Sequence, residues 1–427
     1  MGKKILIITR YYPPEISAAG VCVSAMATRL VKLGHEVTVL TTVPNYPTGI
    51  IPPAYRGRLV LRELLDGVQV IRVWCYISPN RGFVRRILAQ ISFGLTAPVL
   101  GWKAVGHPDV VITGSPPLFN ALAGRALAFG KRCPHIFWVA DLWPESAIQL
   151  GVLRNRSLIW LAERLEWSTY QRARLVWVVS PGLREILSRR GLDQRKIFLL
   201  TNGVDGARFT PSSQAQARAA LGWDERFTVV YTGGHGEYHG LYTLLDAAEL
   251  LLDQRDIRLV LVGEGAEKAN LQAQAEKRGL NNITFLPAQP HSCMPLLLNA
   301  ADTSLVPVRD IPLFRGMLPI KMYEGMACGR PMILAVDGTA REWVEQEATA
   351  ALYVRPEDPV ELARAILQLR DSPELVRLLS QNGRAYVLER FDYQRLAGVL
   401  HQRLETLNSD LPVEEECLVA SVPVEIK

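Results

Sequence analysis

The chain has 427 residues, of which 48% are hydrophobic and 21% are charged. This length exceeds what one ordinary core organises, and the composition excludes a disordered chain and a fibre. Residues 1–206 hold 26 Lys and Arg against 12 Asp and Glu, a net charge of +14, whereas the remainder carries −8. The basic half favours an anionic partner, such as a phosphate-bearing ligand, an acidic membrane or nucleic acid; the alternative is a solvated basic face.

The N-terminal apolar run, residues 4–9, is too short for a signal peptide and predicts a first strand. Predicted helices separate most of the strands that follow, and the helix at 21–34 ends in a glycine. The further strands of this half are expected at residues 35–42, 68–74, 109–114, 135–141, 175–180 and 196–203. Such alternation is typical of a doubly wound parallel sheet.

The alternation starts again at residues 227–234, where a strand runs into glycines. More strands are expected at 258–265, 282–288, 301–308 and 330–336. We therefore predict an α/β protein with two Rossmann-like domains, residues 1–204 and 205–390, that face each other across a cleft lined by the carboxyl ends of their strands. The predicted helix at about 391–407 would pack back on the first domain, and residues 408–427 would form a flexible tail.

One region interrupts this rhythm. The stretch 81–105 opens with Arg81, Arg85 and Arg86 and continues with largely apolar residues interrupted by Gln90 and Pro98. The apolar part is shorter than the ~20 residues that span a bilayer. It predicts either a helix packed within the domain or a helix in the membrane interface, with its arginines on anionic head groups.

The segment PIKMYEGMACGRP, residues 319–331, carries the most chemistry. A loop with Lys321 is expected to lead into a short helix with Glu324 near its start. A carboxylate there can accept both hydroxyls of a ribose, and a lysine one turn earlier can reach a phosphate. The alternative is a capping carboxylate beside a solvated lysine.

Glycine-rich turns follow predicted strands in both halves. Gly233 and Gly234 can bring backbone close to a diphosphate because no Cβ intervenes, and Gly20 offers a similar turn from the first domain. In DLWPE, Asp141 and Glu145 are expected at the carboxyl end of the first sheet, where Asp141 could orient or deprotonate an acceptor hydroxyl. The alternatives are an ordinary strand–helix turn for Gly20 and a turn cap for Asp141.

These segments, taken in order, resemble the family-4 retaining glycosyltransferases of GT-B fold, and in particular a bacterial O-antigen and colanic-acid subgroup that includes fucosamine transferase-like enzymes. The resemblance runs from about residue 3 to 395 and includes TNGVD at 201–205 and LVLVGEG at 259–265. It implies that Glu324 holds the nucleotide ribose and that Glu264 lines the nucleotide side of the cleft. It also implies transfer of a sugar from a nucleotide sugar, with UDP expected as the nucleotide, to a lipid-linked saccharide.

The sequence departs from the family at two places. The first of the family's two glutamates, which contacts the donor sugar, is replaced by Gly316, and the Arg and Lys that clamp the diphosphate are replaced by His235 and His239. Our hypothesis is that Lys321 and Arg315 supply the missing positive charge.

The sequence shows no Asp-x-Asp pair in a suitable loop and no Cys/His spacing that suits zinc, so we expect no essential metal and no cofactor. Scattered cysteines and the absence of a leader favour a cytoplasmic protein, with peripheral contact to the inner face of the membrane through 81–105. Two alternatives share the fold: a sugar-nucleotide 2-epimerase and a non-catalytic sugar-nucleotide binding protein. A nucleic-acid binder is disfavoured, because the basic residues form no recognisable motif.

Overall fold

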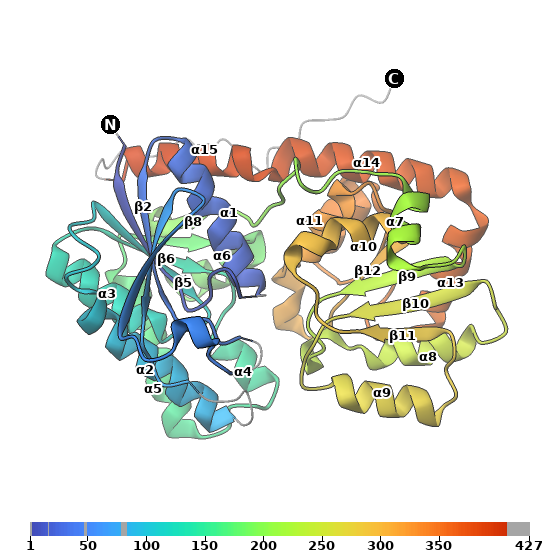
Figure 1. Cartoon of the computed structure of the whole chain (residues 1–427), viewed down its shortest axis with the longest axis horizontal. Coiled ribbons are helices and arrows are strands. Elements are labelled where there is room, and N and C mark those ends of the chain that lie inside the picture. The colour runs from blue at the N-terminus through green and yellow to red at the C-terminus, as the bar shows by residue number, and fades with distance from the viewer. Residues whose placement is uncertain (1, 16, 47–48, 78–82, 408–427) are drawn as a thin grey trace.

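The structure, a computed structural model, describes residues 2–15, 17–46, 49–77 and 83–407. Two sheets, each sandwiched between helices, form two domains that lie side by side (Figure 1). This arrangement confirms the predicted class of two doubly wound α/β domains.

The first sheet has eight strands among the described residues, in the order β3-β4-β2-β1-β5-β6-β7-β8. Neighbouring strands are parallel except for β3 and β4. Strand β3 was not predicted from the sequence; its residues alternate between exposed and half-buried, as expected for an edge strand. The strands are β1 (Lys4–Ile8), β2 (Glu36–Thr42), β3 (Val60–Leu65), β4 (Val68–Val73), β5 (Val110–Ser115), β6 (His135–Val139), β7 (Leu175–Val178) and β8 (Ile197–Leu199).

Helices cover both faces of this sheet, and several begin at a residue whose side chain accepts a hydrogen bond from a free helix amide. Ser17, Asn155 and Ser180 cap α1, α5 and α6 in this way. The helices are α1 (Ala18–Lys32), α2 (Phe83–Gly101), α3 (Asn120–Lys131), α4 (Glu145–Gln149), α5 (Arg156–Arg172) and α6 (Pro181–Arg189), with short 3₁₀ turns η1 (Pro53–Tyr55) and η2 (Gln194–Lys196).

The interrupting region folds as α2, which has two apolar faces. Ala89, Phe93 and Ala97, spaced four residues apart, are buried, and Phe93 and Ala97 pack against the sheet and α3. On the outer side an apolar stripe is exposed, made of Val84, Leu88, Leu95 and Val99. Arg81 lies outside the described residues. Within the described part of the chain, no helix has the length and apolar character needed to cross a membrane.

The second sheet is parallel throughout its described strands, in the order β11-β10-β9-β12-β13-β14. The strands are β9 (Phe227–Thr232), β10 (Ile257–Val262), β11 (Ile283–Leu286), β12 (Thr303–Pro307), β13 (Met332–Ala335) and β14 (Ala351–Tyr353). The helices are α7 (Gln214–Leu221), α8 (Tyr242–Leu250), α9 (Lys268–Lys277), α10 (Met294–Ala300), α11 (Ile320–Ala327), α12 (Thr339–Arg341), α13 (Pro359–Asp371) and α14 (Pro373–Phe391). Shorter helical turns are η3 (Glu237–His239), η4 (His291–Cys293), η5 (Pro312–Gly316) and the π-helical η6 (Glu342–Glu347).

The last helix, α15 (Tyr393–Glu405), leaves the second domain and packs against α1 of the first (Figure 1). The two chain crossings between the domains are bonded to each other, because Val204 donates to Phe391 and accepts from Tyr393, both at 2.9 Å. Farther along α15, a histidine ring nitrogen, His401 Nδ1, lies 2.9 Å from His35 Nε2. The predicted tail, 408–427, lies outside the described residues.

Candidate functional site

Helix α11 carries the two residues that the sequence analysis ranks highest, but not where it expects them. Lys321 is the second residue of the helix rather than part of a loop, and Glu324 is the fifth of eight rather than near the start. The helix dipole therefore does little for Glu324, because its effect fades beyond the first turn. The stabilisation of this buried carboxylate must therefore come from neighbouring side chains.

Glu324 is buried, with a relative exposure of 7%. Its Oε1 lies 2.7 Å from Nε2 of His291, which belongs to η4. The His291 ring packs 5.3 Å from the ring of Phe209. The sequence analysis does not single out His291, because one histidine in a loop between a strand and a helix has no spacing that marks it.

Lys321 places its ammonium group over an aromatic ring. Its Nζ lies 3.9 Å from the centroid of Tyr231. The nitrogen is buried, and it has no hydrogen-bond partner among the described residues. Burial lowers the pKa of Lys321 to about 7, although the nearby Glu324 charge acts in the opposite direction. An anion placed beside this nitrogen would therefore find a donor that nothing else occupies.

The loop after β9 adds two histidines to the same place. The rings of His235 and His239 lie 5.9 Å and 5.8 Å from that of Tyr231, so one tyrosine is neighbour to both and to Lys321. Within the described chain, both ring nitrogens of His235 and Nδ1 of His239 have no hydrogen-bond partner. Burial lowers the pKa of His235 to about 4 and that of His239 well below its usual value.

Glycines let two loops meet at this point. Gly263 has φ +157°, and a Cβ on it would lie 1.8 Å from the carbonyl oxygen of Gly233. A Cβ on Gly233 would in turn lie 2.7 Å from Lys321 Nζ, whereas Gly234 accepts a 2.6 Å hydrogen bond from the Tyr231 hydroxyl through its carbonyl. The glycines were expected to leave space for a diphosphate. In the structure, the backbone of the neighbouring loop and the Lys321 side chain lie in that space.

Two further residues of the predicted donor set have other partners. The Glu264 carboxylate pairs with Lys268 at 2.7 Å, while its backbone carbonyl accepts from the His235 amide at 2.9 Å. Glu264 thus holds the histidine loop through its main chain. Gly20 is the third residue of α1, and its amide donates to the Ser17 hydroxyl at 3.1 Å. The helix cap therefore uses the Gly20 amide, and the close approach of this turn to a diphosphate stays a prediction.

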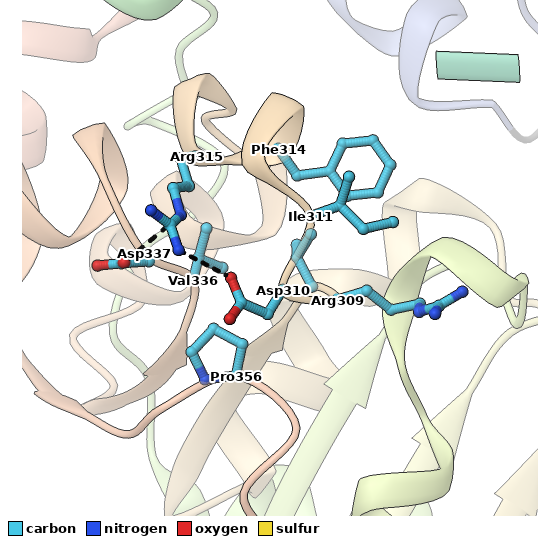
Figure 2. A pocket seen from close by; sticks show the side chains of 9 residues that line it. Arg309, Asp310, Ile311, Phe314, Arg315, Val336, Asp337 and Pro356 are labelled. Atoms are coloured by element: carbon cyan, nitrogen blue, oxygen red, sulfur yellow. Dashed lines mark hydrogen bonds and ion pairs between the residues drawn. The ribbon is translucent and has the colours of Figure 1, made fainter. Parts of the chain in front are cut away.

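Arg315 was expected to supply positive charge to the diphosphate together with Lys321, but its side chain contacts other groups. It lines a small pocket, about 170 Å³ including the solvent at its mouth, that lies where β12 and β13 end (Figure 2). There its guanidinium lies 3.3 Å from Asp310 and 3.7 Å from Asp337. Its positive charge is balanced by these two carboxylates, so Lys321 is the cation that the structure places at the unpaired cluster.

On the first domain, Asp141 follows β6 and lies toward the second domain. Burial raises the pKa of Asp141 to about 6, against hydrogen bonds from Ser146 and the Leu142 amide. Burial raises the pKa of Tyr238, next to the histidine loop, and the charge of Asp141 raises it further. Glu145 instead forms an ion pair with Arg190 at 3.0 Å, which ties α4 to α6. Of the two expected acidic residues, Asp141 is thus half-buried and lies toward the second domain, whereas Glu145 forms a contact between two helices.

Gly316, where the family has its first glutamate, touches the other domain. A Cβ on Gly182, in α6, would lie 2.5 Å from Gly316 Cα, and a Cβ on Gly316 would lie 3.2 Å from Gly182 Cα. A side chain at Gly182 would force η5 and α6 apart, and one at Gly316 would require a smaller shift of the backbone. Among the described residues, no group of three or more His, Cys, Asp and Glu is placed to hold a metal ion.

Comparison with known proteins matches both domains. Residues 17–203 match the "Glycosyl transferase 4-like domain" model and residues 213–386 match "Glycosyl transferases group 1". A protein of Escherichia coli that is named as a colanic acid biosynthesis glycosyl transferase is 27% identical over 380 residues, which cover 86% of this chain and 91% of that protein.

Solved structures share the fold. Sucrose-phosphate synthase from Thermosynechococcus elongatus has a TM-score of 0.74 at 20% identity, covering 95% of this chain and 99% of that one. An Anabaena protein in complex with UDP-glucose has a TM-score of 0.69 at 19% identity, covering 95% and 100%. With both domains matched by family models, the chain belongs to the family-4 glycosyltransferases of GT-B fold.

Proposed function

We propose that the chain transfers a sugar, with retention of anomeric configuration, from a UDP-sugar to a lipid-linked saccharide in the synthesis of a bacterial surface polysaccharide. The observation that carries the donor half is the cluster of Lys321, His235 and His239. The three side chains lie around one tyrosine, and Lys321 Nζ, both ring nitrogens of His235 and Nδ1 of His239 have no hydrogen-bond partner among the described residues. Buried polar groups are normally hydrogen-bonded, so an unpaired set points to a ligand that completes it.

The diphosphate of the donor would lie against this cluster. Lys321 would gain full charge beside the phosphates, and the histidines would donate hydrogen bonds to their oxygens. Negative charge grows on those oxygens as the glycosidic bond breaks, so donors fixed in advance stabilise the transition state. Glu324, in the same helix as Lys321, would accept the ribose hydroxyls. An Anabaena protein of this fold solved with UDP-glucose supports a UDP-sugar as donor.

The acceptor would bind on the first domain beside Asp141. With its pKa raised to about 6, this carboxylate is ionised at neutral pH and still basic enough to orient or deprotonate a hydroxyl. The name of the Escherichia coli relative supports a surface polysaccharide as the product. Glu145, held by Arg190, would keep α4 in place rather than take part in the chemistry.

The exposed stripe of α2 would contact the cytoplasmic face of the membrane. The stripe is apolar, and Arg85 and Arg86 are exposed at the start of the same helix. An apolar face flanked by arginines suits an interface that contains anionic lipid. A lipid-linked acceptor would then reach the first domain without leaving the bilayer.

We propose that the reaction needs neither metal nor cofactor, since Lys321 and the two histidines would meet the diphosphate directly. Loss of activity in a chelator, with recovery on adding magnesium or manganese, would contradict this.

Thermal-shift screening against UDP-, GDP- and ADP-sugars tests the donor half. We expect stabilisation by a UDP-sugar and its loss in Lys321→Glu; unchanged donor affinity in that variant would overturn the assignment of the phosphate site. The nucleotide released with and without a polyprenyl-diphosphate saccharide tests the reaction. Turnover of the donor alone would indicate an epimerase, and binding without release under any condition would indicate a non-catalytic protein.

A further inference from the structure

We infer that His291 positions the Glu324 carboxylate for the ribose hydroxyls of the donor, and that donor recognition therefore depends on a residue of η4 as well as on α11. The inference rests on the proposed function, because it gives a supporting partner to the residue proposed to hold the ribose. His291 is a positioning residue in this scheme, since it acts through Glu324.

The donor and the acceptor in the contact between His291 and Glu324 follow from the chemistry of the two groups. A carboxylate only accepts hydrogen bonds, so Nε2 of His291 is protonated and donates to Oε1 of Glu324 over 2.7 Å. The Glu324 side chain is 9% exposed, and a buried carboxylate without a donor is costly. Among the described residues, His291 is the side chain that supplies this donor. The bond lets a charged group remain buried before any ligand arrives.

The same bond leaves the carboxylate able to bind a diol. Two carboxylate oxygens offer about four acceptor positions, and the His291 bond uses one of them on Oε1. The two ribose hydroxyls need one acceptor each. Fixing Oε1 also fixes the plane of the carboxylate, whose terminal torsion is otherwise broad. The unliganded Glu324 is thus held in one orientation with Oε2 still available.

His291 is itself held from a second direction. Its ring packs 5.3 Å from that of Phe209, which is fully buried in the segment that joins the two domains. Glu324 and His291 come from different elements, so the pair fixes η4 relative to α11. A site supported in this way needs less ordering when the ligand binds.

The opposite role for the histidine would be a plug that the ribose must displace. The two roles predict opposite signs for the removal of the imidazole. A positioning residue, once removed, weakens binding of a ligand that has ribose hydroxyls and leaves a ligand without them unaffected. A plug, once removed, strengthens binding of the first ligand.

Titration calorimetry on the full chain separates these cases. UDP, GDP and ADP are compared first, and the tightest binder is carried forward with its 2′,3′-dideoxy form. We expect His291→Ala to weaken the ribonucleotide about tenfold to a hundredfold, the range for a hydrogen bond to a charged group, and to leave the dideoxy form within about twofold. His291→Gln, which keeps an N–H donor, should recover part of the loss. His107→Ala, an exposed histidine of the first domain, is the matched control.

Two comparisons keep the inference distinct from the proposed function. If Glu324→Ala leaves ribonucleotide binding unchanged, the ribose assignment of the proposed function fails. If Glu324→Ala weakens binding but His291→Ala has no effect, or weakens both nucleotide forms equally, or tightens binding, only the role of His291 fails. In turnover, support would be a raised donor KM with kcat little changed, and no further loss when His291→Ala is added to Glu324→Ala.

Discussion

Gly182 and Gly316 meet backbone to backbone across the boundary between the two domains, at the position where the family resemblance implies a glutamate. A Cβ on Gly182 has no room while α6 and η5 stay in contact, and a Cβ on Gly316, 3.2 Å from Gly182 Cα, would require the backbone there to shift. The missing glutamate is therefore coupled to a close approach of the domains. Restoring it by Gly316→Glu would have to separate them.

Gly182→Ala tests whether this contact matters for catalysis. The added Cβ would lie 2.5 Å from Gly316 Cα, so the domains must move apart in the state described here. We expect kcat/KM to fall about tenfold or more while UDP affinity changes less than about twofold, because misplacement of reacting groups is costly and the donor site lies within the second domain. Gly398→Ala is the control, since a Cβ there meets nothing within 4 Å. Full activity in Gly182→Ala would show that the contact is dispensable.

The pH dependence of donor binding should follow Lys321. Its pKa in the empty site is lowered to about 7, and a bound diphosphate favours the charged form. Below pH 7 the lysine is already protonated, so the affinity for a UDP-sugar should be flat. Above pH 7 binding must take up a proton, and the affinity should fall about tenfold per pH unit. Calorimetry in buffers of different ionisation enthalpy measures the proton uptake, and Lys321→Arg, which stays charged, should flatten the profile.

Lys321→Met should raise the stability of the unliganded protein and abolish its stabilisation by UDP. The folded pKa of the lysine lies below its unfolded value of 10.5, so the folded state loses stability as pH falls from 10.5 toward 7. Removing the unpaired amine removes that cost, and a methionine roughly keeps the volume. At pH 7 or below we expect Tm without ligand to rise by about 2 °C or more, while stabilisation by UDP disappears. A lower Tm would contradict an unfavourable buried amine.

Asp141→Asn should abolish transfer but not donor binding. A carboxylate that serves as the base must be ionised, so the wild-type rate should fall as pH drops below about 6, the pKa of Asp141. We expect the variant to lose about 10²-fold or more in kcat. Because the folded pKa is raised from the usual 3.8, this group lowers stability as pH rises from 3.8 to about 6, and the variant should not melt earlier than wild type at pH 7.5. Wild-type activity in the variant would leave Asp141 as a turn cap.

Charge on the outer face of α2 should release the protein from membranes. Leu95 is 57% exposed on the stripe, and Leu250 is 56% exposed on α8 of the second domain. Leu95→Glu should reduce flotation with vesicles that contain anionic phospholipid, whereas Leu250→Glu should not. Activity on a soluble acceptor should survive both changes. Equal flotation of the two variants, or none by the wild type, would count against docking through α2.

The order of strands and helices could be read from the sequence because each buried strand is a short apolar run bounded by turn residues. The two strands that were not predicted, β3 and β14, lie at the edges of their sheets. Edge strands are less buried, so the apolar pattern in their sequence is weaker. The sequence of residues 81–105 allowed two interpretations, a helix packed within the domain and a helix in the membrane interface. Each corresponds to one side of α2, which is apolar on both its inner and its outer side.

The site was less accessible to sequence reasoning, since its contacts join distant segments. Arg315 and Glu145 have the right charge for the roles expected of them, but partners elsewhere in the sequence, Asp337 and Arg190, hold them. The bond between His291 and Glu324 spans 33 positions, and no local pattern encodes it. Lys321 could be found from its position one helical turn before Glu324, whereas the two histidines could be found only because the family resemblance marks where positive charge is missing.

Because α15 returns to the first domain, it determines which fragments of the chain can correspond to complete domains. Because α15 packs on α1 and the crossings at Val204 and Tyr393 are bonded to each other, the first domain consists of two separate pieces of chain. The second domain is one continuous piece and could be expressed alone for ligand titration. A fragment that stops near residue 204 would expose the apolar face of α1, and a soluble first domain would need α15 joined to it by a linker.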